Sequence, residues 1–318
     1  MSVTADACPA DPFVHPALFY RGDAEYLAGT VPFVWGGLAA DEPVAVAVPG
    51  RNLDLLRREL GADAGRVRLL DMTEAGRNPG RIIPGVLRAF ADAHVDGPVR
   101  IIGEPIWAAR SAVEYPACVQ HEALINLAFA GRDVTILCPY DVETLTPDVL
   151  ADAEATHPVL IDGAGRRTSP AYAPGEVVDR YNRPLATPDG VFELTDTTDL
   201  AAARALAHVR AIRCGLSEEQ AADVEVVVTE LLSNSVEHGS GSGTVRLWDD
   251  DGEFTCEVHD RGKLTDPLAG RRPATLHQPR GRGLLLVNHL ADLVRVHTGS
   301  DGTTIRAYFR ARSGRHTR

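Results

Sequence analysis

The stretch Val226-Val-Val-Thr-Glu-Leu-Leu-Ser-Asn-Ser-Val-Glu-His238 decides the fold of the second half of the chain. It begins as an apolar run and ends as a polar one. In a helix, Glu230, Asn234 and His238 recur every four residues and lie on one stripe. The stripe borders an apolar face made by Val224, Val227, Val228 and Leu231. It is therefore expected at the edge of a core.

Polar groups at the edge of a core need partners, and a hard cation is one of them. The carboxylate of Glu230 and the amide of Asn234 offer the oxygen ligands that Mg²⁺ prefers. The other interpretation is a polar helix edge with no ligand. This stretch alone leaves both interpretations open, because a 3.6-residue pattern is common.

Three further motifs follow in order. Asp260-Arg-Gly262 comes directly after an alternating, strand-like run, Phe254–Val258. Arg280-Gly-Arg-Gly-Leu284 opens a helical run to Leu290, and Gly302–Phe309 is typical of a strand. Each motif alone is weak, since many turns contain Asp-x-Gly and many loops contain Gly-x-Gly. Their order and spacing together are specific.

The four motifs resemble the N, G1, G2 and G3 boxes of the GHKL ATPases, the superfamily of gyrase, Hsp90, histidine kinases and MutL. Among its members they look like the small anti-sigma-factor serine kinases. The resemblance covers about residues 195 to 313. It implies an α+β C-terminal domain of the GHKL ATPase (Bergerat) two-layer sandwich type, with ATP and Mg²⁺ as cofactors.

The resemblance also implies site roles. Glu230 would be the catalytic residue, which orients or deprotonates an attacking hydroxyl or water, and Asn234 would hold Mg²⁺. Asp260 would accept a hydrogen bond from the adenine amino group. Gly281 and Gly283 would free backbone N–H groups for the phosphates at the start of a helix. The implied nucleotide-binding residues are Asn234, His238, Asp260, Gly262, Gly281, Arg282, Gly283, Leu284 and Thr303.

The first half of the chain alternates short apolar runs with helical stretches. The runs expected to form strands are 44–48, 67–71, 99–103 and 134–138. Helices are expected over 23–38, 53–60, 84–94 and 115–129. This alternation predicts an α/β N-terminal domain with a mainly parallel sheet.

This half resembles the MEDS sensory domain, described as a relative of RecA- and KaiC-like ATPases. The resemblance covers roughly residues 12 to 165 and is carried by His15 with Leu18-Phe19-Tyr20, by Gly103–Trp107, and by Glu114, His121-Glu122 and Asn126. The ligand of the family does not carry over. Pro49-Gly-Arg-Asn52 lies where a P-loop would, but it lacks Gly-Lys-Ser/Thr, so no nucleotide is expected there.

One set of polar residues could receive a signal in this domain: His15, Glu104, Trp107, Arg110, Glu114 and His121. For each of them a structural role, as a cap, core-edge residue or helix pair, is the favoured interpretation. The five cysteines show no Cys-x-x-Cys spacing, so the sequence indicates neither a zinc site nor a disulfide framework.

Composition and charge limit the kinds of partner and binding site that the chain can have. The chain has 318 residues and a net charge of −12. Residues 1–194 contain 16 arginines and 27 acidic residues, a net charge of −11. An acidic chain argues against nucleic acid as a direct partner. Lys263 is the only lysine, which excludes a Walker A lysine elsewhere. No transmembrane or signal segment is predicted, so no membrane partner and a cytoplasmic location are expected.

The predicted domains are a sensory domain over 1–165, a Pro-rich linker over 166–198, and an ATPase-like domain over 199–318. The first functional hypothesis is a sensory domain that controls an ATP-dependent protein serine/threonine kinase. The implied partners are a sigma factor or an anti-sigma antagonist, with an unknown small molecule as the signal.

Two alternatives stay open. The first is a non-catalytic switch, in which bound ATP shapes a partner-binding surface for anti-sigma sequestration. The short segment Lys263–Arg280, where the superfamily has its ATP lid, favours binding over turnover. The second is a sensor histidine kinase. It is disfavoured because His208 is followed by Val209-Arg210, and no second long helix precedes the Glu230 stretch.

Overall fold

The computed structural model describes residues 11–274 and 281–311. The chain folds as two compact units. Unit 1 comprises Met1–Met72, Phe90–Ala108 and Ile125–Pro174. Unit 2 comprises Thr73–Ala89, Ala109–Leu124 and Gly175–Arg318.

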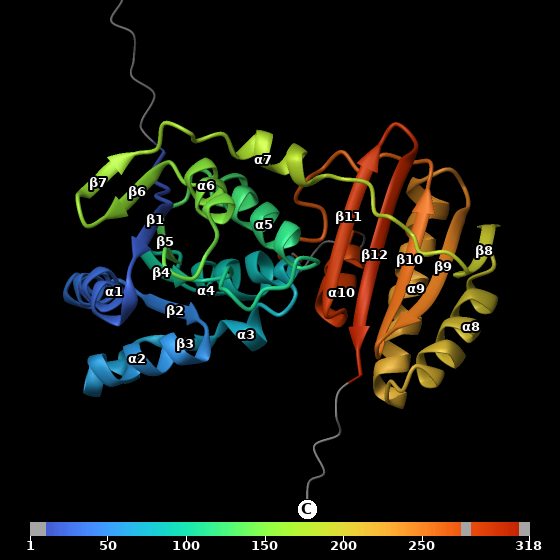
Figure 1. Cartoon of the computed structure of the whole chain (residues 1–318), viewed down its shortest axis with the longest axis horizontal. Helices are drawn as coiled ribbons and strands as arrows, with labels where there is room; N and C mark the ends of the chain where they lie inside the picture. Colours follow the sequence, from blue (N-terminus) through green and yellow to red (C-terminus); the bar gives the residue numbers. More distant parts are fainter. Residues whose placement is uncertain (1–10, 275–280, 312–318) are drawn as a thin grey trace, which may run out of the picture. The chain divides into compact units, whose positions relative to one another are not determined.

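Unit 1 is built on a seven-stranded sheet with the order β3-β2-β4-β5-β1-β6-β7. Neighbouring strands are parallel except β6 and β7, which form an antiparallel pair at one edge. The strands are β1 (Pro16–Tyr20), β2 (Val44–Val48), β3 (Arg68–Asp71), β4 (Val99–Gly103), β5 (Val134–Asp141), β6 (Val159–Asp162) and β7 (Gly165–Thr168). Figure 1 shows the helices that connect these strands.

The helical elements of the first half are α1 (Gly22–Ala39), α2 (Gly50–Leu60), η1 (Gly61–Arg66), α3 (Met72–Ala75), η2 (Pro79–Arg81), η3 (Ile83–Leu87), α4 (Arg88–Ala91), α5 (Tyr115–Ala128) and α6 (Pro147–Thr156). η3 is a π-helical turn. The predicted helix over 84–94 is therefore shorter and irregular. Pro84 lies in its first turn, where a missing backbone N–H is tolerated.

The interior strand β2 explains why the sheet is parallel. All five residues of its Val-Ala-Val-Ala-Val sequence are buried. A strand that is apolar on both faces is stable only when both faces are covered, as in a parallel α/β sheet. The core around β2 includes Val34 from α1 and Leu56 from α2. The predicted α/β class is thus confirmed.

Unit 2 contains an antiparallel five-stranded sheet with the order β11-β12-β10-β9-β8. Its strands are β8 (Phe192–Thr197), β9 (Gly243–Asp250), β10 (Glu253–Asp260), β11 (Leu293–Gly299) and β12 (Gly302–Arg310). The helices are α7 (Pro174–Tyr181), α8 (Leu200–Arg213), α9 (Glu218–His238) and α10 (Gly283–Leu290). The predicted two-layer α+β class is confirmed, because α8, α9 and α10 pack against this sheet (Figure 1).

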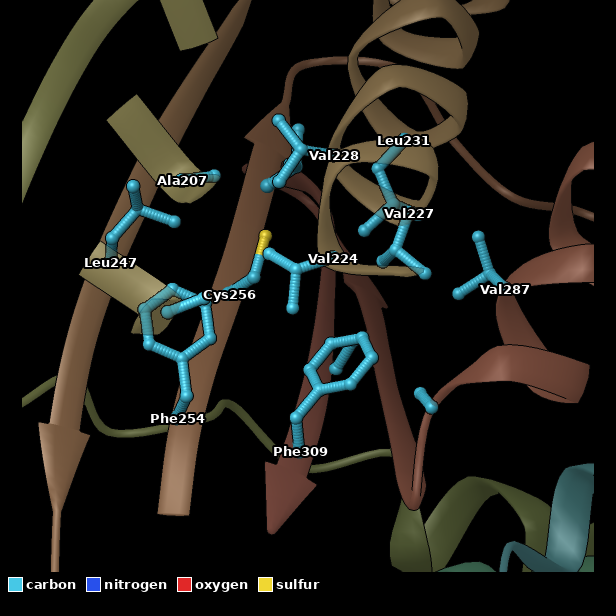
Figure 2. Packing of buried hydrophobic residues seen from close by; sticks show 14 of the residues in the cluster. Ala207, Val224, Val227, Val228, Leu231, Leu247, Phe254, Cys256, Val287 and Phe309 are labelled. Carbon is cyan, nitrogen blue, oxygen red and sulfur yellow. The ribbon is translucent and has the colours of Figure 1, made fainter. Parts of the chain in front are cut away.

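The core between these layers is apolar throughout. Figure 2 shows Val224, Val228 and Leu231 of α9 facing Phe254 and Cys256 of β10. Each of these five side chains is at most 2% exposed. Helix α9 begins at a capping box, in which Ser217 and Gln220 bond each other's backbone N–H groups. The buried face fixes the rotation of α9, and with it the direction of its polar stripe.

The segment 166–198, whose composition predicted a linker, contains helix α7 and strand β8 as well as most of β7. Pro174 starts α7, where its missing N–H is tolerated. Strand β8 pairs with β9 through Phe192, Glu193 and Leu194 and adds the edge strand of the unit 2 sheet. Proline and glycine content alone does not reveal this pairing.

Candidate functional site

The polar stripe of α9 lies where its spacing predicted, at the edge of the unit 2 core. Glu230 and Asn234 are half-buried, and His238, the last residue of the helix, is exposed. The apolar neighbours Val227 and Leu231 point into the core (Figure 2). The same helix therefore supplies both core packing and a row of accessible polar groups.

Asp260 is the last residue of β10, and its carboxylate is held on both sides. Ser235 Oγ donates to Asp260 Oδ2 at 2.8 Å, and the backbone N–H of Gly262 donates to Oδ1 at 2.6 Å. A side chain at Gly239 or Gly262 would collide with this arrangement, because a Cβ at either position would lie within 3 Å of the carboxylate. Both glycines are therefore needed for the close packing around Asp260.

Thr303 is placed by sheet register. It pairs directly with Asp260 across β10 and β12. Its hydroxyl donates to the Gly262 carbonyl at 2.8 Å and accepts from the backbone N–H of Leu264 at 3.1 Å. The buried Thr303 thus fixes the turn that follows Asp260.

Helix α10 begins beside the stripe of α9. A Cβ at Gly283 would lie 2.5 Å from Glu230 Oε2 and 3.4 Å from Asn234 Nδ2. A side chain at this position would displace the Glu230 carboxylate. Gly281 adopts a φ of 82°, a conformation that side chains rarely take. The exposed Arg282 occupies the N-cap position between the two glycines.

These elements surround a cavity of about 510 Å³, within the usual range for small-molecule sites. The predicted residues that line it are Asn234, His238, Asp260, Gly262, Gly281, Gly283, Leu284 and Thr303. Glu230 and Arg282 are not among the described residues in its wall. Glu230 instead lies behind Gly283, in contact distance of the α10 start.

Sequence reasoning missed some residues in and around the site. Ser235, which holds Asp260, follows Asn234 directly but falls on the core side of α9, so its pattern indicates packing. The segment Lys263–Leu264 and the residues from Asp266 to Ala274 except Pro267 and Arg271 also belong to the surroundings of the cavity. The rest of the predicted lid segment, residues 275–280, lies outside the described residues. Nothing in the sequence indicates that Asp266 and Gly270 line the cavity, apart from their position between the Asp260–Gly262 and Arg280–Leu284 motifs.

Arg271 differs from its neighbours because it is buried, with 9% of its surface exposed. Burial lowers the pKa of its guanidinium to about 10. The adjacent Arg272 is exposed and forms an ion pair with Asp266. The arginines near the lid segment are therefore not equivalent.

A second polar group lies in unit 1, at the carboxyl ends of parallel strands. Glu104 is buried directly after β4 and accepts hydrogen bonds from Asn52 Nδ2 at 3.0 and 2.9 Å. Burial raises the pKa of the Glu104 carboxyl to about 8, although the Asn52 bond opposes the shift. Tyr20 Oη lies 3.5 Å from the same amide. The segment Pro49–Asn52, at the start of α2, thus holds the Glu104 carboxyl group where a P-loop would hold phosphates.

The predicted polar set of the first half does not form one cluster. Glu104 belongs to the Asn52 group, whereas His15 contacts Asn126 and Cys138. In unit 2, Glu114 accepts from the backbone N–H and the hydroxyl of Ser111, both at 2.9 Å, and so caps the start of α5. Arg110 donates to the carbonyls of Gly76 and Arg77. The structural interpretation fits Arg110 and Glu114.

Within the described residues, no helix has the length and apolar character needed to cross a membrane. Family comparison matches residues 14–158 to the MEDS family, described as the methanogen/methylotroph, DcmR sensory domain. Residues 194–309 match the histidine kinase-like ATPase domain. No curated protein matches the chain.

Among solved structures, the chain is similar to the RsbU and RsbW domains of Rv1364c from Mycobacterium tuberculosis. The two are 23% identical, with a TM-score of 0.30. The match covers 39% of this chain and 33% of that one, so it spans about a third of that protein's solved chain.

The two family matches follow one another along the chain, with residues 159–193 between them, and each overlaps most of the range expected from the motifs. The second match includes the helix with Glu230 and Asn234, the strand that ends in Asp260, and the start of α10. The chain is therefore a signalling regulator that joins a MEDS sensory domain to a histidine kinase-like ATPase domain.

Proposed function

We propose that unit 2 binds ATP with Mg²⁺ and transfers the γ-phosphoryl group to a serine or threonine of a protein partner, under control of a signal received by the MEDS domain. The observation that carries this proposal is a single cavity lined by Asn234, Asp260 and Gly283. An amide, a carboxylate and a helix start converge there from three separate elements. These are groups suited to a metal ion, an adenine amino group and phosphates, respectively.

Each residue has a defined task in this proposal. Asp260 accepts a hydrogen bond from the adenine amino group, with its carboxylate oriented by Ser235 and Gly262. Asn234 supplies its amide oxygen to Mg²⁺, and the cation neutralises charge on the phosphates. The backbone N–H groups at Gly283 and Leu284 face the phosphates at the positive end of the α10 dipole. Gly281, Arg282, His238 and Thr303 complete the nucleotide site.

The chemical step needs a proton acceptor. The hydroxyl oxygen of the partner forms a bond to the γ-phosphorus, the bond to the bridging oxygen of ADP breaks, and the hydroxyl proton passes to a base. Glu230 is the carboxylate nearest to the α10 start in the described contacts, beside Gly283 and Asn234. A half-buried carboxylate in this position is a suitable general base.

One observation favours a second candidate function, a non-catalytic switch. Glu230 lies behind Gly283 and does not contribute to the described cavity wall, whereas Asn234 and Asp260 do. In a switch, ATP would bind and shape a surface for a sigma factor or an anti-sigma antagonist. No phosphoryl group would move.

The test is incubation of the purified full chain with Mg²⁺ and ATP labelled at the γ-phosphate, with and without candidate partner proteins. Label on a serine or threonine of the partner supports the kinase. Tight, Mg²⁺-dependent ATP binding by calorimetry without any labelled protein supports the switch. Absence of Mg²⁺-dependent ATP binding contradicts both.

A further inference from the structure

Unit 1 contains a buried group of metal-ligand side chains that the nucleotide site does not use. His15, Cys138 and His157 are each at most 1% exposed. They place one ligand atom each within 4.8 Å of one another.

Three adjacent strands bring this group together. His15 directly precedes β1, and Cys138 lies in β5, which pairs with β1 in a register that sets Ala17 opposite Cys138. Side chains two residues apart on a strand share a face, so His15 and Cys138 lie on the same side of the sheet. His157 ends helix α6, two residues before β6 on the other side of β1.

The hydrogen bonds around His15 fix its tautomer. Asn126 Nδ2 donates to the carbonyl of Thr156 at 2.9 Å, which identifies Asn126 Oδ1 as the acceptor. His15 Nδ1 lies 3.2 Å from that oxygen and must therefore carry the proton. The lone pair of His15 is then on Nε2, which lies 3.4 Å from Cys138 Sγ.

His157 is oriented in the same way. Its Nδ1 lies 2.8 Å from the Ala153 carbonyl, which can only accept, so Nδ1 carries the proton and Nε2 the lone pair. The two imidazole rings are 4.0 Å apart between centroids. Metal-binding histidines usually donate their second N–H to a carbonyl or carboxylate in this manner, which fixes the ring for the metal.

We infer that His15, Cys138 and His157 form a three-ligand site for a divalent transition-metal ion of the Zn²⁺ type. Two imidazoles and a thiolate are ligands that Zn²⁺ accepts in tetrahedral geometry. Zn–S and Zn–N bonds of about 2.3 and 2.0 Å place the two ligand atoms roughly 3.5 Å apart. The 3.4 Å between Cys138 Sγ and His15 Nε2 already matches.

On binding, Cys138 loses its thiol proton to solvent and becomes a thiolate ligand, with no change of oxidation state. Three protein ligands leave the fourth tetrahedral position to water. The ion would tie β1 and β5 to the segment between α6 and β6.

The test uses the tag-free full chain, expressed with Zn²⁺ in the medium and analysed for metal by mass spectrometry. We expect close to one Zn²⁺ per chain. Exchange for Co²⁺ should give the absorption of tetrahedral cobalt together with a thiolate-to-cobalt charge-transfer band. Cys138→Ala should abolish that band, whereas Cys118→Ala, which removes an equally buried thiol outside the group, should retain it.

Removing the hydrogen-bond partner of a metal-binding residue should weaken Zn²⁺ binding without abolishing it. Asn126→Ala takes away the hydrogen-bond partner of His15 Nδ1 and should weaken Zn²⁺ affinity about 10- to 100-fold. The matched control is Gln120→Ala on the same helix, whose amide contacts the Val178 carbonyl and should leave affinity unchanged.

A measurement on the unsubstituted chain covers the case in which Cys138→Ala does not fold. In mild denaturant, Zn²⁺ should slow alkylation of Cys138 relative to Cys118, and a chelator should remove the difference. Sub-stoichiometric metal with no cobalt–thiolate band, or equal alkylation of both cysteines with and without Zn²⁺, would overturn the inference.

Discussion

The polar side chains of the unit 2 cavity are accessible, whereas the polar groups described in unit 1 are buried. In unit 2, Asn234, His238 and Asp260 line a cavity of about 510 Å³ and remain accessible. In unit 1, Glu104, His15 and His157 are at most 3% exposed and bond within the protein. A ligand as large as a nucleotide fits the first arrangement. The second accepts a proton or a single ion, because buried polar groups must be satisfied locally.

The difference follows from the supporting elements. The unit 2 site lies where two helices and two strand ends meet, and glycines at 239, 262 and 283 keep space between them. The unit 1 groups lie on or beside parallel strands covered on both faces, where side chains fill the interior.

The largest effect is expected at Glu230. Glu230→Gln keeps the shape but removes the base, so phosphoryl transfer should fall about 10²- to 10⁴-fold, with ATP affinity nearly unchanged. The control is Glu237→Gln, an exposed carboxylate on the same helix. Single-turnover transfer from labelled ATP measures the rate. A wild-type rate in Glu230→Gln would assign the base elsewhere.

The second effect is a pH dependence of unit 1 stability through Glu104. Its pKa is about 8 in the folded chain against an ordinary value of 4.5. Between these values the unfolded chain releases the proton and the folded chain keeps it, so the stabilisation present below pH 4.5 is lost as the pH rises toward 8. At about 1.4 kcal/mol per unit, the change is at most roughly 5 kcal/mol.

Glu104→Gln should remove this slope, while Glu59→Gln, an exposed residue of α2, should leave it intact. The measurement is denaturant unfolding at several pH values from 5 to 9. An identical slope in Glu104→Gln and the unsubstituted chain would show that Glu104 is ionised inside the fold.

The third effect concerns nucleotide binding at Asp260. Asp260→Asn replaces a charged acceptor with a neutral one, at a cost of about 1.5–3 kcal/mol, or roughly 10- to 100-fold in Kd. Calorimetry with ATP and Mg²⁺ measures it, with the loop residue Asp301→Asn as control. Unchanged affinity in Asp260→Asn would place the adenine elsewhere.

The smallest effect is expected at Ser235, which positions the Asp260 carboxylate without lining the described cavity. Ser235→Ala should weaken ATP and adenosine binding by about 1 kcal/mol, or about fivefold. Inorganic triphosphate, which has no adenine, should bind as before. Ser240→Ala, an exposed serine in the loop after α9, is the matched control. An equal loss for triphosphate would indicate general damage to the site.

The residues that the sequence singled out in unit 2 belong to local motifs. Glu230, Asn234 and His238 lie within three helical turns, and Asp260, Gly283 and Thr303 each stand at the boundary of a helix or strand. Helical periodicity and turn residues are readable without the fold. The apolar runs of the first half likewise predicted the parallel sheet.

Other features are invisible in the sequence. Strand β1 was not predicted, because its five residues show no alternation of apolar and polar side chains and contain no turn signal. Its place between β5 and β6 depends on the order of the strands in the sheet. The contact between Ser235 and Asp260 spans 25 residues and depends on how α9 packs on β10.

The sequence alone predicts the fold class of each half, the polar stripe of α9 and the glycine-containing motifs, because these depend on short-range periodicity and backbone geometry. Which distant side chains meet depends on the tertiary structure. His15 and Cys138 are 123 residues apart, and no Cys-x-x-Cys spacing marks them. The register of β1 against β5 places His15 Nε2 and Cys138 Sγ 3.4 Å apart, and this register depends on the packing of the whole sheet.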